Sequence, residues 1–131
     1  MRILIAEDDF ASRKFMLKFL SKYGECDITV DGMEAVDAYL MALDAETPYD
    51  LVCLDIMMPA LDGYQALKAI RDIEQERGIP EENRAKIIMT TALNEGANVN
   101  KAFELGCVAY AGKPIEQVKF ESVLRKLELI P

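Results

Sequence analysis

The 131-residue sequence contains no histidine and only three cysteines, Cys26, Cys53 and Cys107. The cysteines are odd in number and show no Cys-x-x-Cys spacing, and two of them lie within or at the start of apolar runs typical of strands. A metal site built on these cysteines would have no histidine to complete it. We therefore expect three reduced thiols in a cytosolic protein.

Basic residues are also scarce, and no hydrophobic run is long. Lysine and arginine number 15 against 23 aspartates and glutamates, which gives a formal net charge of −8. Because binding to a nucleic-acid backbone needs clustered Lys and Arg, this balance predicts no direct nucleic-acid contact, while a basic protein partner stays compatible with it. Glu7, Asp8 and Asp9 interrupt the N-terminal apolar run, which argues against a signal peptide. No apolar stretch approaches the roughly 18 residues that span a bilayer, so we expect a cytoplasmic protein with no membrane contact.

The sequence does contain enough apolar residues for one packed core. They make up 51% of a length that suits one domain, 1–131. Short apolar runs alternate with longer segments of helical periodicity. The expected strands are Arg2–Ala6, Cys26–Val30, Asp50–Leu54, Lys86–Thr90 and Val108–Ala111, and the expected helices are Phe10–Lys22, Met33–Leu43, Tyr64–Arg77, Gly96–Leu105 and Ile115–Leu129. This order, βα repeated five times, predicts an α/β fold in which a doubly wound parallel sheet carries helices on both faces.

Polar side chains follow four of these five strands. Asp8 and Asp9 come after the first strand, Asp55 after the third, Thr91 after the fourth and Lys113 after the fifth. Because the carboxyl ends of parallel strands share one edge of the sheet, we expect these side chains to meet in one cleft. Three carboxylates, a hydroxyl and an ammonium suit a hard divalent cation and a phosphoryl group.

These residues stand within longer motifs. The motifs are Asp8-Asp9, Asp55 followed by Met58-Pro59 and Asp62-Gly63, Thr91-Ala92, and Lys113-Pro114. Together they resemble the receiver domain of two-component response regulators over nearly the whole chain, and a stand-alone receiver of the chemotaxis type is the most similar form. The resemblance implies a flavodoxin-like sheet with strand order 2-1-3-4-5.

The resemblance also implies roles for the acidic residues. Asp55 would be the phosphoacceptor, attacking the phosphoryl group of a phosphohistidine, where an isolated aspartate at this place would more simply cap a helix or fix a loop. Asp9 and Asp55 would bind Mg²⁺ directly, Asp8 would act mostly through water, and the backbone carbonyl of Met57 would be a further ligand. Asp9 could also be the N-cap of the first helix. Glu7 would either tune the site or simply be exposed.

Three further residues would hold the phosphoryl group in a protein of this family. Thr91 and Lys113 would donate to phosphoryl oxygens, and the Ala92 backbone N–H would add a donor. Thr90 competes with Thr91, but the order Thr-then-Ala matches the family pattern at Thr91. A cis Lys113–Pro114 bond, common in the family, would direct the lysine into the cleft.

The resemblance assigns a switch as well. Tyr110 would swing inward as Thr91 moves, and the output face would comprise the fourth helix, the fifth strand and the fifth helix. Asn94–Asn98 starts the fourth helix poorly, which suits a bistable element or merely a frayed helix. Met57 and Leu93 lie two residues after Asp55 and Thr91, and because neither can orient water by hydrogen bonding, they predict slow autodephosphorylation.

The function expected is therefore a phosphorylation-activated signalling switch. Its partners would be a histidine kinase or histidine phosphotransfer domain and a downstream protein target, with the chain a monomer or a phosphorylation-dependent dimer. A Mg²⁺-dependent phosphatase with an aspartyl nucleophile is an alternative, but Asp55-Ile56-Met57 lacks the second carboxylate of the Asp-x-Asp motif of that enzyme group. A phosphate-independent interaction module is a further alternative. A nucleotide or flavin carrier is disfavoured, because no glycine-rich phosphate loop is present.

Overall fold

Five parallel strands form the centre of the computed structural model, which describes residues 1–92 and 99–131. The strands are β1 (Arg2–Ala6), β2 (Glu25–Thr29), β3 (Leu51–Asp55), β4 (Lys86–Ala92) and β5 (Ala109–Lys113). The helices are α1 (Phe10–Leu20), α2 (Gly32–Asp44), α3 (Gly63–Glu76), α4 (Val99–Glu104) and α5 (Gln117–Lys126), with a short 3-10 turn η1 (Glu81–Asn83). The sheet order is β2-β1-β3-β4-β5, so the flavodoxin-like order is confirmed.

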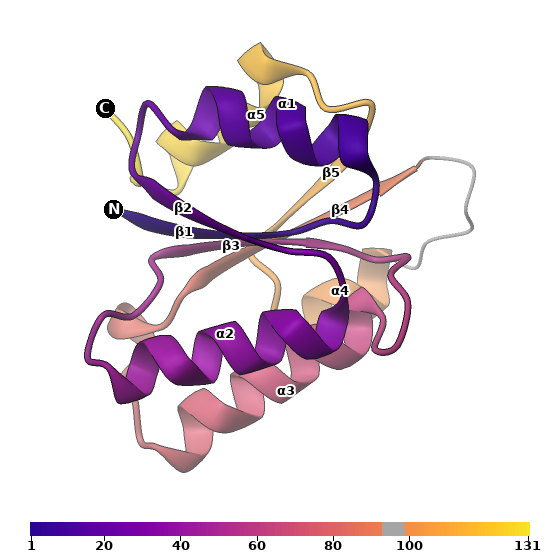
Figure 1. The fold of residues 1–131 in the computed structure, drawn as a ribbon. Helices are drawn as coiled ribbons and strands as arrows, with labels where there is room; N and C mark the ends of the chain where they lie inside the picture. The colour runs from indigo at the N-terminus through magenta and orange to yellow at the C-terminus, as the bar shows by residue number, and fades with distance from the viewer. Residues whose placement is uncertain (93–98) are drawn as a thin grey trace.

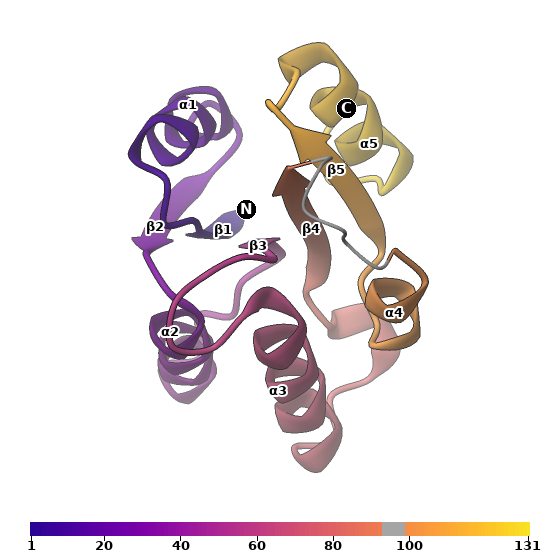
Figure 2. The ribbon, with the colours of Figure 1, turned by 90° about the vertical axis from the view of Figure 1, so that its right-hand side faces the viewer.

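The helices cover both faces of the sheet (Figure 1). Helices α1 and α5 lie on one face, and α2, α3 and α4 lie on the other, as the turned view in Figure 2 also shows. Side-chain alternation along the strands supplies an apolar surface to each layer. On β1, Leu4 and Ala6 join the core under α2 and α3, while Ile3 and Ile5 join the core under α1 and α5.

The central strand β3 is buried along its whole length, as its continuous apolar sequence predicted. Its register with the neighbouring strands places Leu54 beside Ala6 of β1 and Asp55 beside Thr90 of β4. The sheet edge where β1, β3 and β4 end is therefore also where the sequence places its polar residues.

Several predicted boundaries differ from the structure. Strands β4 and β5 continue to Ala92 and Lys113, so Thr91 and Lys113 lie within the last two residues of their strands rather than after them. Helix α5 stops at Lys126 because Glu128 adopts a left-handed φ of 61°, which ends the helix before Leu129. The predicted first turn of the fourth helix, Gly96 to Asn98, lies outside the described residues.

Candidate functional site

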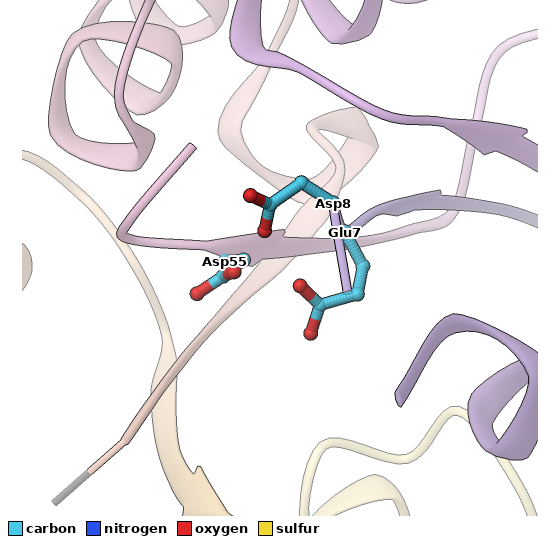
Figure 3. Close-up of side chains that lie close together, drawn as sticks. All are labelled: Glu7, Asp8 and Asp55. Carbon is cyan, nitrogen blue, oxygen red and sulfur yellow. The ribbon is translucent and has the colours of Figure 1, made fainter. Parts of the chain in front are cut away.

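Three carboxylates gather at the carboxyl ends of β1 and β3 (Figure 3). Glu7, Asp8 and Asp55 each offer an oxygen atom, and these oxygens all lie within 4.8 Å of one another. Glu7 and Asp55 are almost fully buried, with 1% and 3% of their surfaces exposed, while Asp8 is exposed. The burial follows from the fold, because Asp55 ends the central strand and Glu7 directly follows the strand beside it.

Lys113 brings a cation into this group from the end of β5. Its Nζ lies 3.0 Å from Asp55 Oδ2 and also contacts Glu7 Oε1. The Lys113–Pro114 peptide bond is cis, as expected. Three carboxylates and one ammonium leave an excess of negative charge, which a divalent cation would neutralise.

The environment shifts the acid–base equilibria of the Asp55–Lys113 pair. Burial raises the pKa of Asp55 from 3.8 to about 6, and the neighbouring Glu7 carboxyl adds to the rise, against the Lys113 ammonium, which lowers it. Burial by itself would lower the pKa of Lys113, but hydrogen bonds and attraction to Glu7 and Asp55 raise it further than burial lowers it. At neutral pH the lysine is therefore charged and Asp55 is mainly ionised.

Asp9 does not belong to the carboxylate group. Its Oδ2 accepts a hydrogen bond of 2.8 Å from Ser12 N, which makes it the N-cap of α1, and this hydrogen bond lowers the pKa of its carboxyl. The sequence predicted Asp8 and Asp9 as the acidic pair, whereas the structure gathers Glu7 and Asp8. Because β1 ends at Ala6, the two residues nearest the strand end reach the site and the third is already committed to the helix.

A second cation beside the acidic turn escaped the sequence reasoning. Arg13 Nη1 donates to the backbone carbonyl oxygens of Glu7 at 3.1 Å and Asp8 at 3.4 Å. Its guanidinium also lies over the ring of Phe10, with 5.5 Å between the guanidinium carbon and the ring centroid. The available signal was the position of Arg13 one helical turn after the Asp9 cap.

The predicted phosphoryl-binding residues lie on the neighbouring strand. Thr91 is buried near the end of β4, and its Oγ1 donates to Ala92 O at 3.3 Å. Alternation places Thr91 on the same face of the sheet as Met89, the face against which Tyr110 packs. Thr90 is the residue in register with Asp55. Because Thr90 and Thr91 are neighbours on one strand, their side chains face opposite sides of the sheet.

Tyr110 is packed against the core under α2, α3 and α4. Its hydroxyl is buried, and burial raises the pKa of this phenol, while the neighbouring Thr91 hydroxyl lowers it by less. The ring therefore already lies inward in this structure.

The loop after β3 is the remaining part of the site. Met57, 54% exposed, donates its backbone N–H to Asp55 Oδ1 at 3.3 Å, so the loop is in direct contact with the buried carboxylate. Mg²⁺ prefers oxygen ligands and is usually held by one or two carboxylates with retained waters. The carboxylates gathered here thus fit a hard divalent cation. Leu93, the other residue behind the dephosphorylation prediction, lies outside the described residues.

Comparison with known proteins identifies the family. The model of the response regulator receiver domain matches residues 3–125. The chain belongs to the receiver domain family. Receiver domains are the modules of two-component and phosphorelay systems, so the resemblance inferred from the motifs is confirmed.

Curated relatives place this receiver domain among chains of different lengths. The probable histidine kinase 2 of Oryza sativa subsp. indica is 32% identical over 127 residues, which cover 89% of this chain and 12% of the kinase. This chain therefore spans about an eighth of the length of that relative. The two-component response regulator 24 of Arabidopsis thaliana is 32% identical over 125 residues, which cover 95% of this chain and 81% of the relative.

Solved receiver domains share the fold. The receiver domain of Ssk1, crystallised with the histidine phosphotransfer protein Ypd1 of Saccharomyces cerevisiae, gives a TM-score of 0.80 at 27% identity, covering 96% of this chain and 87% of that chain. The receiver domain of the sensor histidine kinase PA1611 of Pseudomonas aeruginosa, with a magnesium ion in its active-site cleft, gives a TM-score of 0.75 at 27% identity, covering 95% and 94%.

Proposed function

We propose that residues 1–131 form one receiver domain in which Asp55 accepts a phosphoryl group from a phosphohistidine. The observation that carries the proposal is the placement of the Asp55 carboxylate: buried at the end of β3, 3.0 Å from the Lys113 ammonium and grouped with Glu7 and Asp8. A rigid, partly desolvated carboxylate with a cation beside it suits nucleophilic attack on a phosphoryl group.

The chemistry follows from the positions of these side chains. A carboxylate oxygen of Asp55 attacks phosphorus, the bond from phosphorus to the imidazole nitrogen of the donor breaks, and the nitrogen keeps the electron pair. The Lys113 ammonium, which contacts Asp55 before the reaction, then also donates to a phosphoryl oxygen. The Thr91 hydroxyl and the Ala92 N–H donate to the other oxygens. Attack of water on phosphorus later regenerates the carboxylate. Bound Mg²⁺ supplies charge neutralisation for these oxygens.

The proposed magnesium ligands are Asp8, Asp55 and the Met57 carbonyl. Glu7 differs from them because it contacts Lys113 and its Oε2 accepts from Asp9 N at 3.3 Å. Glu7 therefore holds the lysine and the acidic turn in place. The sequence-based assignment of Asp9 as a direct ligand has no support from its position as a helix cap.

The proposed partners follow from the same family. A histidine kinase or a histidine phosphotransfer domain supplies the phosphoryl group, in line with the solved complex of Ssk1 with Ypd1. A downstream protein reads the face formed by α4, β5 and α5, where Tyr110 and Lys113 help to line a hollow of about 330 Å³. The described part of the chain has no helix with the length and hydropathy to cross a bilayer, and we propose a cytoplasmic location.

Phosphorylation with a small acyl phosphate tests the proposal. The protein is incubated with Mg²⁺ and acetyl phosphate, and intact mass is measured for the wild type, Asp55→Asn and Asp37→Asn. Asp37 is an exposed carboxylate on α2, so its variant matches the charge change away from the site. We expect one added phosphoryl group in the wild type and Asp37→Asn and none in Asp55→Asn. A phosphoryl group that persists in Asp55→Asn would reject the assignment.

A further inference from the structure

The start of α2 and the loop after β3 touch backbone to backbone. Gly32 is the first residue of α2 and is buried. A Cβ at this position would lie 2.6 Å from the carbonyl carbon of Leu61, closer still to its oxygen, and 2.8 Å from its Cβ. Real Cβ atoms essentially never approach other atoms below 3.0 Å, so the contact exists only because residue 32 has no side chain.

The loop that receives this contact is closed at its base. Gly63 N donates to Ile56 O at 2.8 Å, and Ile56 N donates to Thr90 O at 2.9 Å. A Cβ at Gly63 would lie 2.7 Å from the Cα of Ile56, so the two ends of the loop are held against each other. Because these contacts hold both ends of the loop, we expect a displacement of Leu61 to shift residues 57–60.

Met57 lies within that segment. Its backbone N–H already contacts the Asp55 carboxylate, and its carbonyl is the ligand assigned to the loop above. Ala60 in the same segment has a left-handed φ of 67°, and Leu61 N donates to Pro59 O at 2.8 Å, so the loop holds one tightly turned conformation. The loop therefore links Leu61, which contacts Gly32, to Met57, which contacts Asp55.

We propose that Gly32 is a positioning residue for magnesium binding: because it has no side chain, it lets Leu61 pack close and so positions the loop that carries Met57, whose backbone N–H contacts Asp55. This inference rests on the proposed function, because it concerns a ligand of the proposed ion. It adds to that function a residue on α2, an element that supplies none of the ligands. Groups that only orient ligands typically change metal affinity tenfold or more when they are replaced.

Substitution of two glycines separates positioning from stability. Gly32→Ala introduces a methyl group against Leu61, and Gly24→Ala introduces the same group against backbone atoms of Met1, at the opposite end of the sheet. Mg²⁺ dissociation constants are measured by titration calorimetry, and the stability of each ion-free protein is measured by urea unfolding. We expect about tenfold weaker Mg²⁺ binding in Gly32→Ala and a change below about twofold in Gly24→Ala.

The outcomes distinguish this inference from the function beneath it. If the wild type binds no Mg²⁺, or if Asp8→Asn binds Mg²⁺ as tightly as the wild type does, the proposed metal site is refuted and the inference with it. Wild-type binding at the site together with equal affinities in the two glycine variants refutes the role of Gly32 alone.

A measurement on the wild type covers the case in which Gly32→Ala does not fold. In a ¹⁵N NMR titration with Mg²⁺, we expect the amide signals of Gly32 and Leu61 to shift with the same dissociation constant as that of Met57. The amides of Gly24 and Gly78 serve as references, because no atom would meet a Cβ at Gly78 within 4 Å and Gly24 packs near Met1. A Gly32 amide that stays still while Met57 shifts overturns the proposal.

Discussion

The buried Asp55 carboxyl should make the ion-free protein less stable as pH rises, and Asp55→Asn should remove that effect. In the folded protein the pKa of Asp55 is raised from 3.8 to about 6. The protonated form is therefore favoured by folding: its stabilising contribution is complete below pH 3.8 and is lost as pH rises through about 6. A rise of this size corresponds to about 3 kcal/mol at neutral pH.

Thermal unfolding of the two proteins in EDTA, between pH 4 and 8, measures this difference. Titrating groups that do not contact Asp55 are common to both proteins and cancel, and a pH-independent effect of the amide leaves the slope of the difference unchanged. We expect the stability of Asp55→Asn relative to the wild type to grow by up to about 3 kcal/mol across the range, on the order of 10 °C in Tm.

Magnesium supplies the matched control. A cation that binds ionised Asp55 stabilises the wild type at neutral pH and should reduce the difference from Asp55→Asn. A difference between the two proteins that stays constant from pH 4 to 8 in EDTA would refute the reasoning, since it would mean that folding does not perturb this carboxyl.

Further predictions concern stability, each measured by urea unfolding. Ala60→Gly should stabilise the protein by about 1 kcal/mol, because Ala60 holds a left-handed φ of 67° that glycine adopts without strain; a loss of stability would contradict this. Tyr39→Phe should cost about 1.5–3 kcal/mol, because the Tyr39 hydroxyl donates at 2.5 Å to the fully buried carboxylate of Glu74. Lys68→Ala breaks an exposed ion pair with Asp72, one helical turn further along α3, and should cost less than about 0.5 kcal/mol. A cost equal to that of Tyr39→Phe would be inconsistent with burial as the deciding factor. Phe120→Ala should cost about 3–5 kcal/mol, because the ring packs edge-on against another core aromatic.

The order of elements could be predicted from the sequence because it depends on local patterns. Most strands are short apolar runs, and the helices have their own periodicity, in some cases with a cap such as the Asp62–Gln65 capping box that begins α3. The ends of elements were less predictable, since Thr91 and Lys113 extend their strands through pairing with neighbours that are distant in sequence.

The acidic residues after β1 show where the structure departs from the motif-based expectation. In sequence, Glu7, Asp8 and Asp9 are three equivalent carboxylates after a strand. In the structure the last of them caps α1, while the first is buried against Lys113. The choice depends on where β1 stops and how α1 begins, and neither is fixed to one residue by composition or periodicity.

The sequence by itself determined the five βα units, the family and the strand-end position of Asp55, because these depend on residue types and on spacing along the chain. Only the tertiary structure decided that Glu7 replaces Asp9 beside Asp55, that Arg13 holds the acidic turn and that Gly32 supports the loop bearing Met57. These are contacts between separate elements or choices among neighbouring side chains, and they are fixed by strand register and close packing, which no local pattern encodes.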